Sequence, residues 1–329
     1  MSAKRVLFGW ELGDGLGHVS RMIPVARALR DQGCECVFAI KALQPAYPLL
    51  ESLGFPVVPA PRMKPPAKLP EDRPPVSSMA DILELIGFGS RDRLEPVVFG
   101  WDSLFSLVNP ALIVSDYAPS LNLAARGRIP TLLLGDGFTI PPSDADDFPA
   151  IRGTGVPARS EVLLGAVQEV QRRFGQAPIA RLPQLFEGSA EVLAVIRELD
   201  PYLERRRSPP TGPINPLPPM ATGDPEMDYF AYLSATHPSS RIVLEGLAQS
   251  DWKGEVFLRD ATPRHLARFE GRLKIHTVPQ DLVRQSERAR VIIHHGGLNT
   301  TMEILARGRP QLFVPRHYEQ TMNGAQVCR

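Results

Sequence analysis

The sequence predicts an α/β protein with two Rossmann-like domains, each built on a parallel sheet. Short apolar runs alternate with stretches of helical periodicity in the N-terminal part, as in a parallel sheet covered by helices on both faces. A proline-rich stretch at 209–224 interrupts this pattern, which then resumes behind it. A chain of 329 residues has the length expected for two such domains.

The first elements form a βαβαβ pattern. A glycine-rich loop, Gly13 to His18, follows the first strand, and Gly33 and Gly54 end the first two helices. The expected strands are 6–9, 36–40 and 57–58, and the expected helices are 19–32 and 46–53. Crossovers of this kind place the strands parallel and side by side.

The rest of the first domain, which we expect to span 1–208, is more irregular. The proline-rich loop 59–75 and the segment after Gly135 are expected to line an acceptor pocket. Helical periodicity recurs at 80–88, 94–108 and 160–174, and strands are expected at 111–114, 129–134 and 192–196. The triplet Arg205-Arg206-Arg207 is expected to be a solvated edge of the linker 209–224.

The second domain is expected to span 225–329. Its expected strands are 229–233, 256–259, 274–278, 291–293 and 311–314, with a helix at 239–249. Between the last two strands lie a His-His-Gly-Gly turn and a helix that ends at Gly308, and a polar loop with Glu319, Gln320 and Asn323 follows. The chain stops at Arg329 soon after this loop, so we expect an incomplete second domain.

The glycine turn of the second domain predicts an anion site. Gly296 and Gly297 allow a phosphate to approach the backbone, and the helix behind them directs its N–H groups and its positive dipole end at the same place. Thr300 and Thr301 can add hydroxyl donors, and Glu303 can accept hydrogen bonds from sugar hydroxyls. Nothing resembles the Walker lysine, so a diphosphate with sugars attached fits better than a magnesium nucleoside triphosphate. The alternative is that the threonines cap a helix and Glu303 interacts with its dipole.

One segment of the second domain resembles the donor-binding signature of the UDP-glycosyltransferase superfamily: VIIHHGGLNTTMEILARGRPQLFVPRHYEQTMNGAQV. Members of this superfamily have the GT-B fold, so the resemblance implies two Rossmann-like domains that face each other across a cleft. The resemblance implies that His295 and Thr300 contact the diphosphate, Glu303 the ribose, and Glu319 and Gln320 the transferred sugar, whereas His294 is structural. The full set implied for the donor is Ser234, Thr236, Val278, Gln280, His295, Gly296, Gly297, Asn299, Thr300, Thr301, Glu303, Glu319, Gln320 and Asn323.

A second similarity lies in the first domain. His18 follows a glycine loop and Asp116 follows a strand, so an imidazole base and a carboxylate partner are expected there. GHVSRMIPVARAL resembles the acceptor-domain motif of the same superfamily and LIVSDYA its strand that ends in the partner aspartate, while GxGLGHxxR also resembles MurG-like transferases and nucleotide-sugar hydrolases. The alternative is that both residues cap helices. The acceptor-side loop residues are Gly15, Gly17, Gly135 and Asp136, and Arg21 takes a place near the proline of the motif.

Two positions depart from the superfamily pattern. Ser234-Ala235-Thr236 stands where a serine/glycine phosphate loop is usual, and Thr277-Val278-Pro279-Gln280 lacks the tryptophan that stacks on the base. The sequence therefore leaves both UDP-linked and dTDP-linked donors open.

The composition excludes several classes of function. A net charge of +1 gives no footprint of a nucleic-acid binder, and three cysteines provide no disulfide framework. No apolar run is long enough to span a membrane, so a cytoplasmic protein is expected, with peripheral membrane contact still open. We expect no metal and no cofactor besides the nucleotide sugar, because Asp144, Asp146 and Asp147 are not in the setting of a DxD pair.

These features predict an inverting, metal-independent glycosyltransferase that moves a hexose from a UDP- or dTDP-sugar to an acceptor hydroxyl, with His18 as general base. The acceptor, a small molecule or a lipid, stays open. One alternative is a nucleotide-sugar hydrolase or epimerase on the same fold. Another is a non-catalytic remnant that binds the nucleotide sugar, as the short second domain would suggest.

Overall fold

The computed structural model of the chain describes residues 3–13, 15–63, 76–151 and 160–328. Most of the proline-rich loop assigned to the acceptor pocket, 64–75, lies outside them. The chain divides into two compact units, Met1–Asn215 and Pro216–Arg329, so the boundary falls inside the expected linker 209–224. The start of that linker packs on the first unit, because the Thr211 N–H and hydroxyl both donate to the Leu193 carbonyl, at 3.0 and 2.8 Å.

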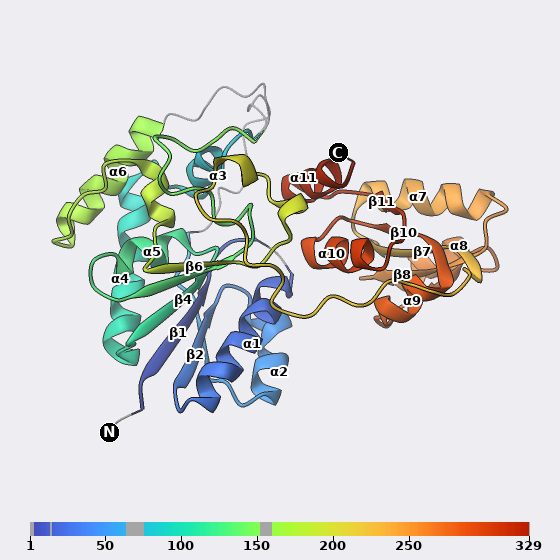
Figure 1. The fold of residues 1–329 in the computed structure, drawn as a ribbon, viewed down its shortest axis with the longest axis horizontal. Helices are drawn as coiled ribbons and strands as arrows, with labels where there is room; N and C mark the ends of the chain where they lie inside the picture. Colours follow the sequence, from blue (N-terminus) through green and yellow to red (C-terminus); the bar gives the residue numbers. More distant parts are fainter. Residues whose placement is uncertain (1–2, 14, 64–75, 152–159, 329) are drawn as a thin grey trace. The chain divides into compact units, whose positions relative to one another are not determined.

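The first unit is a parallel sheet in the order β3-β2-β1-β4-β5-β6, with helices on both faces (Figure 1). Its strands are β1 (Arg5–Trp10), β2 (Glu35–Ile40), β3 (Val57–Pro59), β4 (Leu112–Asp116), β5 (Thr131–Gly135) and β6 (Ala190–Leu193). Its helices are α1 (Gly17–Asp31), α2 (Leu43–Ser52), α3 (Met79–Ile86), α4 (Arg91–Val108), α5 (Pro119–Ala125) and α6 (Ser160–Arg173), with 3₁₀ turns at Leu182–Phe186, Arg197–Leu199 and Leu203–Arg205.

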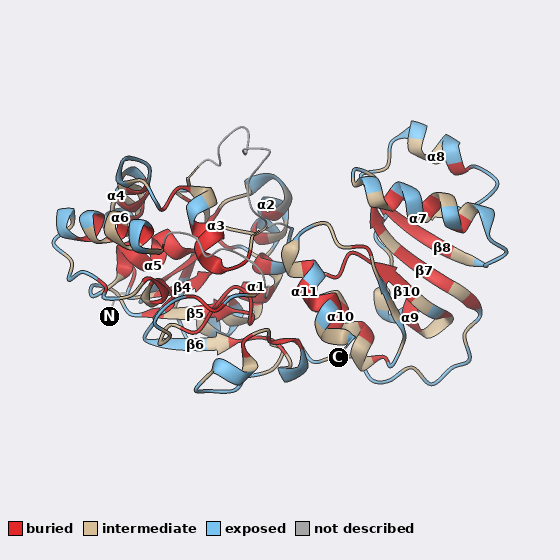
Figure 2. Cartoon of the chain, turned by 90° about the horizontal axis from the view of Figure 1, so that it is seen from above, coloured by how far each residue is buried: buried red, intermediate tan, exposed pale blue. Residues whose placement is uncertain are grey.

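Strand β1 shows why this sheet needs helices on both faces. Phe8 and Trp10 belong to the apolar cluster that includes residues of α1 and α2. Gly9 points the other way, where an added Cβ would lie 2.1 Å from Leu121 of α5 and 3.4 Å from Trp101 of α4. Figure 2 shows the result as buried strands beneath helices whose outer surfaces are exposed. The continuous apolar run of β1 follows from burial on both faces.

The second unit is also a parallel sheet, in the order β11-β10-β7-β8-β9. Its strands are β7 (Met227–Ser234), β8 (Gly254–Arg259), β9 (Lys274–His276), β10 (Ala289–His294) and β11 (Gln311–Phe313). Its helices are α7 (Pro238–Gln249), α8 (Pro263–Phe269), α9 (Leu282–Arg288), α10 (Leu298–Ala306) and α11 (Tyr318–Val327).

The prediction of a polar loop after the last strand was wrong, because residues 318–327 form α11. The polar residues that suggested a loop turn inward instead. Gln320 and Asn323 are buried, and each makes a hydrogen bond to backbone within the unit. Their burial removes the apolar stripe by which an amphipathic helix is recognised in a sequence.

Both sheets reverse their strand order at one point. In the first unit the chain proceeds from β1 to β2 and β3 on one side and returns to β4 on the other. In the second unit the same reversal lies between β7 and β10. In open α/β sheets, ligands bind at the carboxyl ends of the strands where the order reverses.

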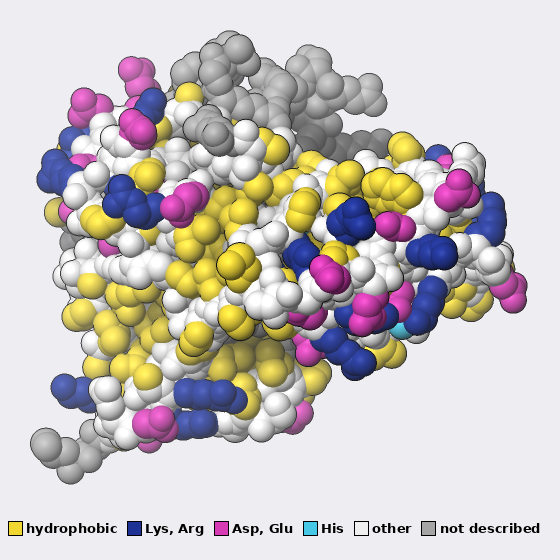
Figure 3. All heavy atoms as spheres, turned by 45° about the vertical axis from the view of Figure 1, so that its right-hand side comes forward, with side chains coloured by type: hydrophobic (Ala, Val, Ile, Leu, Met, Phe, Trp, Pro, Cys, Tyr) yellow, Lys and Arg dark blue, Asp and Glu magenta, His cyan; other side chains and the backbone are white. Residues whose placement is uncertain are grey.

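Two properties of the surface bear on partners. None of the helices in the described part of the chain is long and apolar enough to cross a membrane. On the face drawn in Figure 3, Lys and Arg side chains lie among Asp and Glu side chains, in keeping with a net charge of +1. That face offers no extended basic surface for a polyanion.

Candidate functional site

The first candidate site lies at the reversal point between β1 and β4. His18 is in the first turn of α1, just after the loop that leaves β1, and Asp116 is the last residue of β4. Strands β1 and β4 are direct neighbours, with Trp10 paired to Asp116. The fold thus brings together two residues far apart in the sequence, as their positions after strand ends predicted.

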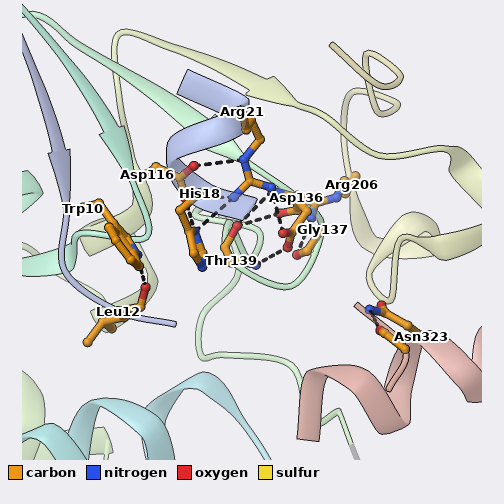
Figure 4. A network of polar contacts seen from close by, with 11 residues as sticks. Trp10, Leu12, His18, Arg21, Asp116, Asp136, Gly137, Thr139, Arg206 and Asn323 are labelled. Carbon is orange, nitrogen blue, oxygen red and sulfur yellow. Dashed lines mark hydrogen bonds and ion pairs between the residues drawn. The ribbon is translucent and has the colours of Figure 1, made fainter. Parts of the chain in front are cut away.

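His18 and Asp116 form a buried hydrogen-bonded pair (Figure 4). The His18 Nδ1 lies 2.8 Å from Asp116 Oδ1. A carboxylate only accepts hydrogen bonds, so Nδ1 carries the hydrogen and the lone pair is on Nε2. Arg21 Nη2 lies 3.3 Å from the same Nδ1, but a protonated nitrogen cannot accept from it.

The Nε2 of His18 faces the loop that follows β1. A Cβ built on Gly13 would lie 2.3 Å from this nitrogen, and Gly13 has a φ of +79°. A side chain at residue 13 would therefore cover the lone pair as well as strain the backbone. Gly15 has a φ of +85° with nothing within 4 Å of its Cβ position, and Gly17 has no such neighbour either.

Aromatic rings hold the imidazole of His18. The Trp10 ring lies 5.2 Å from it between centroids and the Tyr117 ring 6.3 Å, both nearly parallel to it. Tyr117 has a φ of 48°, which is unusual for a residue with a large side chain. Backbone strain of this kind persists where the surroundings fix it, and it occurs here directly after Asp116.

Arg21 is the residue whose part in this site the sequence did not reveal. It lies one turn after His18 on α1, and its guanidinium donates to both oxygens of Asp116, at 2.8 and 2.9 Å. It also donates to Asp136 Oδ2 at 2.9 Å. Burial alone would raise the Asp116 pKa, but the charges of Arg21 and His18 hold that pKa below its usual value. The i, i+3 spacing to His18 was the signal available in the sequence.

Asp136 is fixed by the turn that follows β5. Its carboxylate accepts from the Thr139 N–H at 2.9 Å, and its own N–H donates to the Thr139 hydroxyl at 2.9 Å. Gly135 is required just before it, because a Cβ there would lie 2.5 Å from the Thr139 hydroxyl. Asp136 is therefore a buried member of the hydrogen-bond network around His18.

Arg206 closes the far side of this turn. It was expected at a solvated linker edge, but its side chain is 4% exposed and pairs with Asp200. It donates to the carbonyls of Gly137 and Ile140, at 2.9 and 2.8 Å. Arg205 and Arg207 are exposed as expected, but the expectation was wrong for Arg206, because a buried carboxylate and two carbonyls provide the hydrogen bonds that water would otherwise supply.

The second candidate site lies at the reversal point of the other sheet. His295 directly follows β10, and Ser234 ends β7. The Ser234 N–H donates to His295 Nε2 at 2.8 Å, and His295 Nδ1 donates to the Val314 carbonyl at 2.7 Å. A backbone N–H only donates and a carbonyl only accepts, so the tautomer of this imidazole is fixed.

Both ring nitrogens of His295 are thus occupied within the unit. Burial lowers its pKa to about 4, so the ring is neutral at neutral pH. The ring of His295 therefore has no N–H left to donate to the diphosphate, which is the side-chain contact that the resemblance implied. The imidazole instead joins the last residue of β7 to the segments that follow β10 and β11.

His294 has a structural environment, as expected. Burial lowers its pKa to about 4, its Nε2 lies 2.8 Å from Gln311 Oε1, and its Nδ1 accepts from the Gly296 N–H at 3.1 Å. The ring therefore supports the glycine turn from behind.

The N-terminus of α10 retains the properties of an anion site. Thr301 N–H is bonded to the Gly297 carbonyl, while the N–H groups of the first helical residues, Leu298 to Thr300, precede any intrahelical partner. Asn299 is exposed and Thr300 half-buried, so both are accessible. Thr301 is fully buried and donates its hydroxyl to the Gly297 carbonyl at 3.0 Å, so it stabilises the helix instead of offering a donor.

Gly296 connects this turn to α11. It has a φ of +88°, and a Cβ there would lie 2.9 Å from the Gln320 carbonyl. The Asn323 side chain donates to the Gly296 carbonyl at 2.9 Å, and the Gln320 side chain accepts from the Arg316 N–H at 2.8 Å. Gln320 and Asn323 thus shape the turn, and Glu319 beside them is half-buried.

The remaining donor-side residues are placed as follows. Glu303 is half-buried one turn into α10, and burial, with a smaller effect of Asp281, raises its pKa. Ser234 is buried, with its hydroxyl 2.9 Å from that of the exposed Thr236.

Val278 is 67% exposed, and the Gln280 amide donates to its carbonyl at 2.9 Å. Gln280 also lines a pocket of about 640 Å³ among Glu226, Glu255, Lys274 and Arg288.

Comparison with solved structures shows where this fold occurs. The chain is similar to the calicheamicin glycosyltransferase CalG4 (TM-score 0.69, 17% identity, covering 100% of this chain and 84% of that one). It is also similar to the spinosyn rhamnosyltransferase SpnG complexed with spinosyn aglycone (0.63, 15%, 98% and 84%). A third is the Streptomyces sp. SF2575 glycosyltransferase SsfS6 complexed with thymidine diphosphate (0.59, 17%, 99% and 85%). The predicted GT-B fold, two Rossmann-like units, is thus confirmed.

No family model matches the chain, and no curated protein matches its sequence. Among the residues that the structure describes, no group of three or more His, Cys, Asp or Glu is arranged to hold a metal ion.

Proposed function

We propose that the chain is an inverting glycosyltransferase that moves a hexose from a UDP- or dTDP-sugar to an acceptor hydroxyl. The observation that carries the proposal is the His18–Asp116 pair, in which Nδ1 is held by a buried carboxylate and Nε2 keeps its lone pair. The fold shared with glycosyltransferases, including one complexed with thymidine diphosphate and one with an aglycone, supports the same reaction.

In the proposed step, His18 Nε2 accepts the proton of the acceptor hydroxyl as its oxygen attacks the anomeric carbon. The bond between that carbon and the diphosphate oxygen breaks on the opposite face, which inverts the configuration. Asp116 then faces the imidazolium that forms and stabilises it. The diphosphate leaves with the electron pair of the broken bond.

The charge that develops on the departing diphosphate is assigned to the N-terminus of α10. The N–H groups from Leu298 to Thr300, which precede the first intrahelical bond, the hydroxyl of Thr300 and the helix dipole all favour an anion there. Glu303 is assigned to the ribose hydroxyls. Because these donors serve the leaving group, the proposed reaction uses no metal, and we expect turnover to survive chelation by EDTA.

The compartment and acceptor are proposed more broadly. All three cysteines are free thiols, which supports a reducing compartment such as the cytoplasm. We propose an acceptor that is a small molecule with a free hydroxyl, as for the neighbour complexed with an aglycone.

Product analysis tests the proposal against its alternatives. The chain is incubated with UDP- and dTDP-hexoses, with and without a panel of hydroxylated acceptors, and products are identified by mass spectrometry. A glycosylated acceptor with inverted configuration, absent in His18→Ala, supports the transferase. Free hexose released without acceptor would indicate a hydrolase, and nucleotide binding without any product would indicate a binding protein.

A further inference from the structure

Two carboxylates and one guanidinium surround the base in the first unit. Arg21 bridges Asp116 and Asp136 with three short hydrogen bonds of 2.8 to 2.9 Å, and His18 shares the Asp116 carboxylate (Figure 4). All four residues are at most 8% exposed. Charges in such a setting are poorly screened by water or salt, so their sum acts on the imidazole.

The charges do not cancel while His18 is neutral. Asp116 and Arg21 alone would form a neutral ion pair, with little net field to favour a proton on the neighbouring ring. Asp136 adds a second negative charge, so the group carries −1 when His18 is neutral and 0 when it is protonated. The arrangement is therefore balanced for the protonated base.

We infer that Arg21 and Asp136 are positioning residues for the His18–Asp116 pair: Arg21 fixes the carboxylate of Asp116, and Asp136 cancels the charge that Arg21 brings. For catalysis, this inference rests on the proposed function. The effect of these two charges on the protonation of His18 does not depend on that function, because it is present without substrate. The hydrogen-bonded turn at Asp136 and Thr139 contributes to this arrangement, because it holds the Asp136 carboxylate within hydrogen-bond distance of the Arg21 guanidinium.

The other charged groups around His18 are the same in every variant compared. Lys41 donates to the Gly13 carbonyl and lies over the Trp10 ring, at 5.6 Å from its centroid. Glu11, whose pKa burial raises to about 7, accepts from the N–H groups of Ser120 and Leu121. Arg206 and Asp200 form a neutral pair beyond the Asp136 turn. Tyr117 presents its ring face to the imidazole, and its hydroxyl lies 3.9 Å from Met79 Sδ.

The test is the proton titration of His18 in the full chain, followed by long-range ¹H–¹⁵N NMR and assigned with His18→Gln. Asp136→Asn leaves Arg21 uncompensated, so the titration midpoint of His18 should fall by about one pH unit. Adding Arg21→Gln to Asp136→Asn removes the extra cation and restores the −1 charge. The midpoint should then return to within about 0.3 units of the wild-type value.

Asp102→Asn is the matched control, because it also removes a carboxylate paired with an arginine, Arg128, but on the surface of the same unit. It should leave the His18 midpoint unchanged. If the double variant does not fold, Arg21→Lys in the Asp136→Asn background, which keeps the cation, should leave the midpoint low.

A folded Asp136→Asn protein with an unchanged His18 midpoint, or a double variant with a midpoint below that of the single variant, overturns the inference. The measurement needs no substrate. A chain that shows the midpoint shifts but forms no glycosylated product would refute the proposed function and leave the electrostatic inference standing. In an active chain, Asp136→Asn should shift the acidic limb of the kcat/KM profile to lower pH.

Discussion

Each unit places a histidine at the reversal point of its parallel sheet, His18 after β1 and His295 after β10, yet the two rings have opposite chemistry. Each follows the strand beside the reversal of its sheet. His18 gives Nδ1 to a carboxylate and keeps the lone pair of Nε2, whereas His295 gives both nitrogens to backbone groups. The fold places each histidine at the end of a strand. The hydrogen-bond partners of the ring then determine whether it can accept a proton or only stabilises the structure.

The largest effect should come from removing the proposed base. His18→Ala is expected to lower kcat by about a thousandfold, as for loss of a general base, and to leave nucleotide affinity within a factor of about two. Initial rates at saturating donor, with calorimetric titration of dTDP and UDP, measure both. A variant that retains a tenth of the wild-type kcat would show that another group takes the proton.

Covering the Nε2 lone pair of His18 should also lower kcat, as removal of the ring does. Gly13→Ala puts a Cβ over His18 Nε2 and is expected to lower kcat by about a hundredfold. Gly15→Ala is the matched control, since it has the same left-handed strain but an open Cβ position, and it should change kcat less than about threefold. Equal losses in the two variants would mean that backbone strain, not access to the nitrogen, is responsible.

The bracing role of His295 predicts a loss of stability. His295→Ala leaves the Ser234 N–H and the Val314 carbonyl buried without partners, and should lower the free energy of unfolding by about 2 to 4 kcal/mol. Urea unfolding of the full chain measures it. His237→Ala, a ring 6.0 Å from His295 with a Nδ1 that has no partner, should cost less than about 1 kcal/mol.

The same histidines predict a pH dependence of stability. The pKa values of His294 and His295 fall from 6.5 to about 4 on folding, so between these pH values the unfolded chain binds more protons than the folded one. The histidines' contribution is present above pH 6.5 and lost as the pH falls toward 4, by up to about 3 kcal/mol for each ring. In His295→Gln, unfolding measured from pH 7.5 downward should depend less steeply on pH, and an unchanged slope would refute the assignment.

The smallest expected difference separates neighbouring threonines of α10. Thr300→Val should weaken binding of dTDP or UDP about tenfold, because an accessible hydroxyl is lost at the proposed anion site. Thr301→Val should change binding less than twofold, because its hydroxyl is already bonded to the Gly297 carbonyl. Calorimetric titration distinguishes them, and a larger effect at Thr301 would contradict the placement of the diphosphate.

Periodicity predicted most of the strands and long helices, since burial on both faces leaves a clear apolar run. It did not predict α5, α8 or α9, each of which has only seven residues. Helices α5 and α8 begin with a proline, and α9 follows the capping residue Asp281. It also misassigned α11, in which the buried Asn323 side chain bonds to the Gly296 carbonyl, 27 positions earlier in the sequence. Such partners cannot be read from spacing.

The candidate residues show the same limit. The positions of His18 and Asp116 were predictable because parallel strands bring their carboxyl ends to one edge. The roles of Arg21 and His295 were not, because each depends on which groups lie within hydrogen-bond reach: two carboxylates in one case, an N–H and a carbonyl in the other.

The tautomers of these two rings test the account most directly. In long-range ¹H–¹⁵N NMR of the full chain at pH 7.5, both should carry their hydrogen on Nδ1, and on acidification the His295 ring should stay neutral until the pH approaches about 4. Binding of dTDP should leave the His295 tautomer unchanged. A His18 ring with its hydrogen on Nε2 would contradict its assignment as the general base. A His295 ring protonated at pH 6 would contradict its assignment as a structural residue.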